Sequence, residues 1–68
     1  MSERDKFSVW VFDGEARRLE TRILLDIGTA LGLAFELTDR PDAQRIIITD
    51  SGDDTVWEWV YNKGITWQ

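Results

Sequence analysis

The amino-acid sequence predicts an α+β domain in which one amphipathic helix packs on one face of a mostly antiparallel four-stranded sheet, in the order β-α-β-β-β. Two observations support this prediction. Short runs rich in β-branched and aromatic residues occur near both ends of the chain, and after the first run the apolar spacing changes to three and four residues. Short turn-forming segments separate the later runs, which favours an antiparallel meander.

The length and composition of the chain limit it to one domain. A chain of 68 residues has room for one hydrophobic core, and its 43% hydrophobic and 31% charged residues are typical of a globular protein. Since the chain contains no cysteine, aromatic side chains must stabilise the small core in place of disulfides. We therefore expect residues 1–68 to form a single compact domain, with residues 1–5 flexible.

The first strand is expected at residues 6–12 and the helix from residue 15 onward. Asp13 and Gly14 form a turn signal, and Asp13 is also a suitable N-cap for the helix. Gly32 is a suitable stop, and Gly28, which has no Cβ, would allow a close approach of the helix to the sheet. One helical face would carry the apolar residues Ala16, Leu19, Ile23, Ile27, Ala30 and Leu31, and we expect Ile23 and Ile27 to be buried against the sheet.

Three further strands are expected in the second half, at residues 34–38, 45–49 and 56–61. Residues 39–42, which include the only proline, and residues 50–54 provide the turns between them. In the 50–54 turn, we expect the aspartates to accept backbone hydrogen bonds and Gly52 to adopt a positive φ. Residues 65–68 form either a short fifth strand at the sheet edge or a tail packed on the sheet.

The residue types argue against catalysis. The chain has no histidine and no cysteine, and none of its serines lies in a nucleophile-elbow motif. The acidic 50–54 turn contains oxygen ligands, but their spacing does not match the EF-hand loop, and neither Gly28 nor Gly32 follows a strand as in phosphate-binding loops. We therefore predict that the protein is not an enzyme and has no catalytic residues, no cofactor-binding residues and no metal site.

The aromatic residues are the first candidate binding feature. Trp57, Trp59 and Tyr61 share one face of the last long strand, and the strand at residues 6–12 is apolar on both faces. A single helix covers only one face of a sheet, so some apolar surface is either exposed, covered by residues 65–67 or covered by a partner. Two interpretations remain open, a tryptophan-rich core and a docking patch formed by Trp10, Trp57 and Trp59.

The charge distribution is the second candidate binding feature. The net charge is −5, with net −1 in residues 1–35 and net −4 in residues 36–68. This balance disfavours direct nucleic-acid binding and favours a partner with a basic surface, although solubility alone is an alternative explanation of the charge. The candidate acidic residues for partner binding are Asp39, Asp42, Asp50, Asp53, Asp54 and Glu58.

In general character the chain resembles small phage-encoded inhibitors of the anti-CRISPR type. The resemblance concerns the short, cysteine-free, acidic α+β chain without catalytic residues, and the acidic meander from Glu36 to Glu58. It implies a phage protein that binds the basic nucleic-acid channel of a target protein, in some members of the group by imitating the charge of DNA.

Together these features predict a small acidic protein-binding module, an inhibitor or adaptor that docks on a basic surface of a partner protein. The alternative is a self-associating structural or accessory protein that buries an aromatic sheet face in a homodimer, so both a monomer and a homodimer remain open. No run is apolar and long enough for a signal peptide or a membrane span, so we expect a cytoplasmic protein without a membrane partner.

Overall fold

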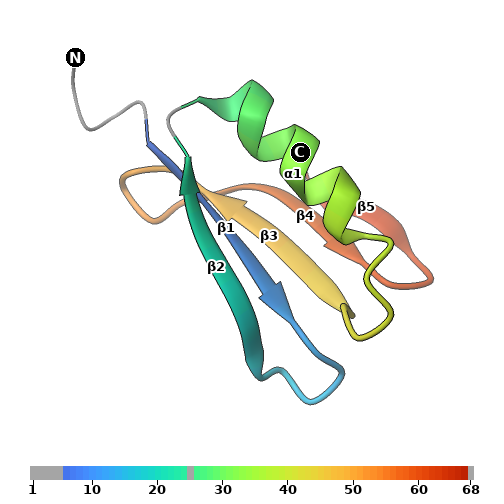
Figure 1. Ribbon diagram of the computed structural model, residues 1–68. Helices are drawn as coiled ribbons and strands as arrows, with labels where there is room; N and C mark the ends of the chain where they lie inside the picture. The colour runs from blue at the N-terminus through green and yellow to red at the C-terminus, as the bar shows by residue number, and fades with distance from the viewer. Residues whose placement is uncertain (1–5, 25, 68) are drawn as a thin grey trace.

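The structure, a computed structural model, describes residues 6–24 and 26–67. Within this part of the chain it is an α+β fold with one helix and an antiparallel sheet of five strands (Figure 1). The expectation for residues 1–5 lies outside the described residues. In chain order, the elements are β1 (Phe7–Phe12), β2 (Arg18–Leu24), α1 (Ile27–Leu37), β3 (Arg45–Thr49), β4 (Thr55–Val60) and β5 (Gly64–Trp67).

The core lies between α1 and the central strands of the sheet. The strand order is β2-β1-β3-β4-β5, and every neighbouring pair is antiparallel. Directly paired residues share a sheet face, and the pairs Val9–Ile48 and Ile48–Trp57 therefore place three apolar side chains on the face that α1 covers. The fully buried apolar residues are Val9, Val11, Ala30, Ala34, Ala43, Ile46, Ile48 and Trp57.

The predicted helix from residue 15 and the predicted strand at residues 34–38 were both wrong. Residues 18–24 form β2, and α1 runs from Ile27 to Leu37, so the observed order is β-β-α-β-β-β with five strands instead of four. Asp13 caps a hairpin turn and not a helix, because its Oδ1 accepts hydrogen bonds from the backbone N–H groups of Glu15 and Arg17, both at 2.9 Å. The three- and four-residue spacing of apolar residues in residues 16–23 therefore did not indicate a helix.

The position of α1 also corrects the expectations for its residues. Its N-cap is Asp26, and the helix continues through Gly32, the predicted stop. Ile23 is 67% exposed and Ile27 38% exposed, so the prediction that both are buried was wrong. The atom nearest to a Cβ built on Gly28 is Oδ1 of Asp26, so this glycine does not provide the close approach to the sheet. The small residues Ala30 and Ala34, which are fully buried, provide it.

From residue 45 onward, the strands of the structure agree with the sequence prediction. Strand β3 has the predicted bounds, β4 begins and ends one residue earlier than predicted, and β5 is the edge strand that was one of two alternatives. In the 50–54 loop, Oδ1 of Asp50 accepts hydrogen bonds from the N–H groups of Gly52 and Asp54, as predicted. The positive φ, 66°, belongs to Asp53 and not to Gly52.

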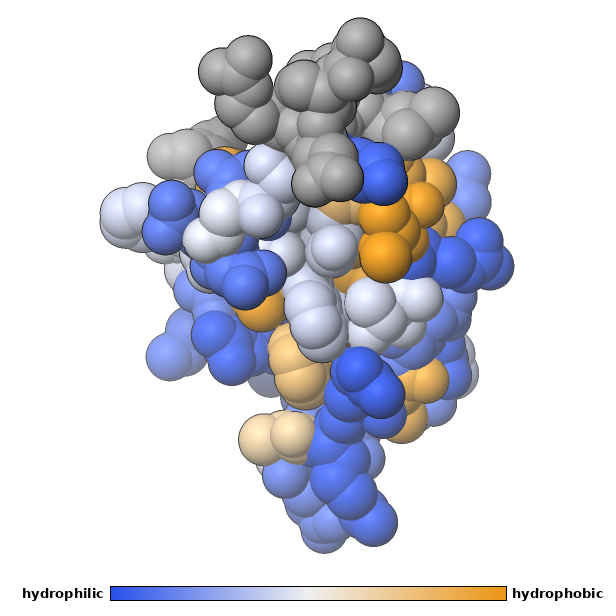
Figure 2. All heavy atoms as spheres, turned by 90° about the vertical axis from the view of Figure 1, so that its left-hand side faces the viewer, coloured by the Kyte–Doolittle hydropathy of each residue, from blue (hydrophilic) through white to orange (hydrophobic). Residues whose placement is uncertain are grey.

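The single helix covers only part of one sheet face. Its main contacts are with β1, β3 and β2, and on the β4 side the ring of Phe35 reaches that of Trp57. Figure 2 views the molecule from the side of β2, where hydrophilic residues predominate and apolar side chains lie in separate small groups. The alternating charged residues Arg18, Glu20 and Arg22 occupy this edge strand, and such charges oppose pairing with another strand.

Candidate partner-binding groove

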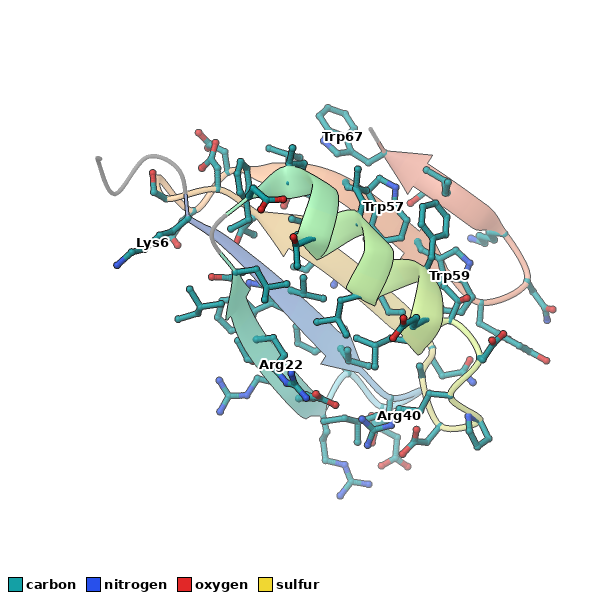
Figure 3. All side chains as sticks on the ribbon, turned by 45° about the horizontal axis from the view of Figure 1, so that its top comes forward. Lys6, Arg22, Arg40, Trp57, Trp59 and Trp67 are labelled. Atoms are coloured by element: carbon teal, nitrogen blue, oxygen red, sulfur yellow. The ribbon has the colours of Figure 1, made fainter. Side chains whose placement is uncertain are left out.

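An apolar groove of about 450 Å³ lies between α1 and the β4–β5 side of the sheet. Figure 3 shows Trp57 and Trp59 in this region, between α1 and β5. All seven side chains that line the groove are apolar, and we call this surface the apolar groove. Its residues are Phe7, Ile27, Leu31, Phe35, Val56, Trp57 and Ile65.

The helix and the strands each contribute one side of the apolar groove. Ile27, Leu31 and Phe35 recur every four residues on α1 and therefore lie along one stripe of its surface. Trp57, which is only 3% exposed, forms the base, and its ring and that of Phe35 make an edge-to-face contact with a centroid distance of 5.6 Å. Ile65 closes the far side, because β5 pairs it with Trp59 on the same sheet face.

Large apolar side chains remain exposed around the groove. Phe35 is 51% exposed and Ile65 40% exposed, and both lie in the groove together with Ile27. Next to it, the rings of Trp59 on β4 and of Tyr61, which follows β4, make an edge-to-face contact with a centroid distance of 6.5 Å. Contiguous exposed apolar surface of this kind is typical of interaction sites in soluble proteins.

Acidic residues lie on the elements at one end of the apolar groove. Pairing of Ser8 with Thr49 places the 50–54 loop at the end of the sheet where β1 begins and where α1 has its first turn (Figure 1). Lys6 is a basic residue at this end (Figure 3). Of the described residues, the carboxylates on the elements at this end belong to Asp26, Asp50, Asp53 and Asp54.

The Asp26 carboxylate is held charged by the helix that it caps. Its Oδ1 accepts a hydrogen bond of 2.7 Å from the N–H of Thr29, and its Oδ2 accepts one of 3.1 Å from the Thr29 hydroxyl. These hydrogen bonds lower the pKa of Asp26 below its ordinary value, the backbone donor having the larger effect. Asp53 and Asp54 take part in none of the ion pairs of the described residues.

The structure separates the sequence-predicted site residues into different surfaces. Trp57 and Trp59 face α1, with Trp57 in the apolar groove. Trp10 lies on the opposite face of the sheet, where its Nε1 donates a 2.9 Å hydrogen bond to the Thr49 hydroxyl and Arg18 lies over its ring. Glu58 shares that outer face, because it pairs with Ile47, which points away from α1.

The predicted acidic residues also fall into two groups. Asp39 and Asp42 lie in the connection between α1 and β3, whereas Asp50, Asp53 and Asp54 follow β3 at its other end. Two of the predicted acids are paired with arginines. Asp42 accepts a hydrogen bond of 2.6 Å from Arg40, which also contacts Glu20. Glu58 accepts a hydrogen bond of 2.5 Å from Arg45 and another from the Thr66 hydroxyl. These two hydrogen bonds, the one from Arg45 first, lower the pKa of the Glu58 carboxyl.

The outer face of the sheet mixes apolar and basic residues. Trp10, Phe12 and Ile47 are half-buried there by their neighbours, and the guanidinium of Arg45 lies 5.7 Å from the centre of the Phe12 ring. No element of the described residues packs across this face. It is a second candidate surface, distinct from the apolar groove.

Most of the apolar groove was not predicted from the sequence. Of its lining residues, only Trp57 was a candidate, because the helix was expected to end at Gly32 and Phe35 was assigned to a strand. The four-residue spacing of Ile27, Leu31 and Phe35 was the signal that could have extended the helix through Gly32.

The search for a metal site and the comparisons with known proteins add no further residues to the candidate site. Among residues 6–24 and 26–67, no three His, Cys, Asp or Glu side chains lie close enough together to hold a metal ion. The described residues also contain no helix with the length and hydropathy needed to cross a bilayer. Comparisons with protein-family models, curated proteins and solved structures find no match.

Proposed function

We propose that this chain is a protein-binding module, an inhibitor or adaptor, that docks through the apolar groove on a partner protein with a basic surface. The observation that carries the proposal is the groove itself, an open apolar surface with Phe35 and Ile65 about half exposed on its two sides. Burial of such surface is the main favourable term in protein association, and aromatic residues are frequent among the residues that dominate binding energy.

The lining of the apolar groove favours binding over chemistry. None of its seven residues has an ionisable or nucleophilic side chain. General acid–base or nucleophilic catalysis would require such a group within reach of a bound substrate. The lining therefore supports recognition of apolar side chains of a partner.

The acidic end of the groove supports a basic partner. Asp26, Asp50, Asp53 and Asp54 lie at this end, and the chain has a net charge of −5. Because Asp42 and Glu58 are paired with arginines, the predicted acids do not form one continuous anionic surface. The proposal therefore rests on the apolar groove together with its acidic end, and not on imitation of DNA charge along the meander.

Affinity capture with matched variants tests this function. Phe35→Asp introduces a charge into the groove, and Ile23→Asp introduces the same charge at an exposed site on the outer face of β2. We expect the wild type and Ile23→Asp to retain the same partner from a lysate of the source cell, and Phe35→Asp to lose it. If folded Phe35→Asp retained that partner, the apolar groove would not be the binding site.

The alternative is self-association through the outer sheet face, and the exposure of Ile23 beside the half-buried Trp10 and Ile47 favours it. Light scattering distinguishes the two functions, because the proposed module has a mass of 7.9 kDa in the absence of its partner. A doubled mass that Ile23→Asp returns to the monomer value would support the homodimer.

A further inference from the structure

We propose that the apolar groove binds a basic amphipathic α-helix of the partner protein, which lies beside α1 over β4 and β5. This inference rests on the proposed function and specifies the structural element and the charge of the partner. Three observations support it: the uncovered width of the sheet, the stripe of apolar residues on α1, and the acidic end of the groove.

The sheet has space for a second helix. Five strands spaced about 4.8 Å apart place the axes of the two edge strands roughly 19 Å apart, and a helix with its side chains is about 10–12 Å wide. Since α1 packs against β1, β3 and β2, the face above β4 and β5 is left for a second helix of the same width. Helices in contact lie about 8–10 Å apart, so a partner helix would touch both α1 and the sheet.

The stripe on α1 favours a helix over an extended segment. Ile27, Leu31 and Phe35 form a ridge of residues four apart, which extends for about 12 Å at 1.5 Å per residue. Ridges of this type pack between the ridges of another helix. Three of the seven lining residues belong to α1, whereas an added strand would have to form its hydrogen bonds along the free edge of β5.

Charge complementarity favours a basic helix. Among the described residues, Asp26, Asp50, Asp53 and Asp54 lie at the end of the fold where α1 begins, together with Lys6. A helix with Lys or Arg on its exposed face near that end would form favourable contacts with these carboxylates, and an acidic helix would be repelled.

A pair of synthetic peptides tests the inference. Both are 18-residue amphipathic helices with leucine at every third or fourth position, one with lysines and the other with glutamates on the polar face. Fluorescence anisotropy of labelled peptides measures binding, and circular dichroism measures the helix formed on binding. We expect saturable binding of the lysine peptide with a gain in helicity, and at least tenfold weaker binding of the glutamate peptide.

Variants locate the binding and test its charge dependence. Phe35→Asp should weaken binding of the lysine peptide at least tenfold, whereas Ile23→Asp should leave it unchanged. Replacement of Asp50, Asp53 and Asp54 by asparagine should reduce the difference between the two peptides, because asparagine keeps the turn hydrogen bonds and removes the charge. Ile65→Asp, on the other side of the groove, replaces Phe35→Asp if that variant does not fold.

Four results would overturn the inference. Equal binding of both peptides would remove the charge preference, and binding that resists both groove variants would place the helix elsewhere. If neither peptide binds but a cellular partner still depends on Phe35, the groove binds a different element, and the proposed function remains. A homodimer that Phe35→Asp dissociates would identify a second copy of this chain as the occupant of the groove.

Discussion

Ala16 occupies a backbone conformation that favours glycine. Its φ is 65°, in the turn where the N–H of Ala16 donates to the carbonyl of Asp13. The left-handed conformation costs an L-residue about 1–2 kcal/mol, and glycine avoids this cost. Glycine also makes the unfolded chain more flexible, which lowers the stability of the folded protein by about 0.4–1 kcal/mol. We therefore predict that Ala16→Gly stabilises the protein by up to about 1 kcal/mol, measured by urea denaturation. Ala16→Val should destabilise it, and equal stabilities of the two variants would contradict the assigned conformation.

Asp26 links the stability of α1 to pH. Because its pKa is lowered in the folded state, the unfolded chain binds more protons as pH falls, and the contribution of this carboxylate is lost below about pH 4. We predict that Asp26→Ala lowers the free energy of unfolding at pH 7 through loss of the N-cap, and that the difference from wild type shrinks at pH 3.

Asp26→Asn is the control for this prediction. Asparagine caps a helix well but does not titrate. This variant should therefore keep most of the wild-type free energy of unfolding at pH 7, and the part of its pH dependence that comes from Asp26 should be absent. Urea denaturation of the three proteins at both pH values provides the measurement. A difference between Asp26→Ala and wild type that is equal at pH 7 and pH 3 would contradict the charged cap.

At the scale of elements, Gly32 weakens a helix that tertiary contacts hold in place. It lies within α1, and a Cβ built on it meets no atom within 4 Å. We predict that Gly32→Ala raises the free energy of unfolding by about 0.5–1 kcal/mol, because alanine loses less backbone entropy in a helix. Gly64→Ala should instead destabilise, since Gly64 has a φ of +81°. Chemical denaturation of both variants would reveal the contrast, and a destabilising Gly32→Ala would indicate that α1 ends earlier.

At the scale of the whole molecule, charge and apolar contact should act on different steps of binding. The 50–54 loop carries exposed Asp53 and Asp54 outside the apolar contact itself. We predict that asparagine at Asp50, Asp53 and Asp54 mainly slows association with the lysine peptide and flattens its salt dependence. Phe35→Ala should mainly accelerate dissociation, at least tenfold, because the exposed ring anchors the contact.

Stopped-flow fluorescence at two salt concentrations separates these effects. Phe35 is the correct residue to truncate, since Trp57 is buried in the core and its replacement would reduce stability as well as binding. An unchanged association rate in the asparagine variant would show that the acidic loop does not steer the partner.

The sequence by itself determined the fold class, the bounds of β3, the approximate position of β4 and the turn chemistry of Asp50. These features depend on neighbouring residues: a β-branched run such as Ile46 to Ile48 and an aspartate before a glycine act locally. The same local analysis failed for residues 15–38. In the edge strand β2, Arg22 pairs with Val9 of the core face, whereas Ile23 lies on the outer face, so hydrophobicity does not indicate which side of this strand is covered. A helix that contains Gly28 and Gly32 also has low intrinsic propensity.

Only the tertiary structure decided where the binding surface lies. The register of β1, β3 and β4 places Trp57 under α1 and Trp10 on the opposite face, so two predicted candidates belong to different surfaces. The apolar groove combines residues from α1, β4 and β5 that are distant in sequence. The groove exists because one helix is only wide enough to cover about half of a five-stranded sheet. The number and order of the strands, which the tertiary structure provides, are needed to compare these two widths.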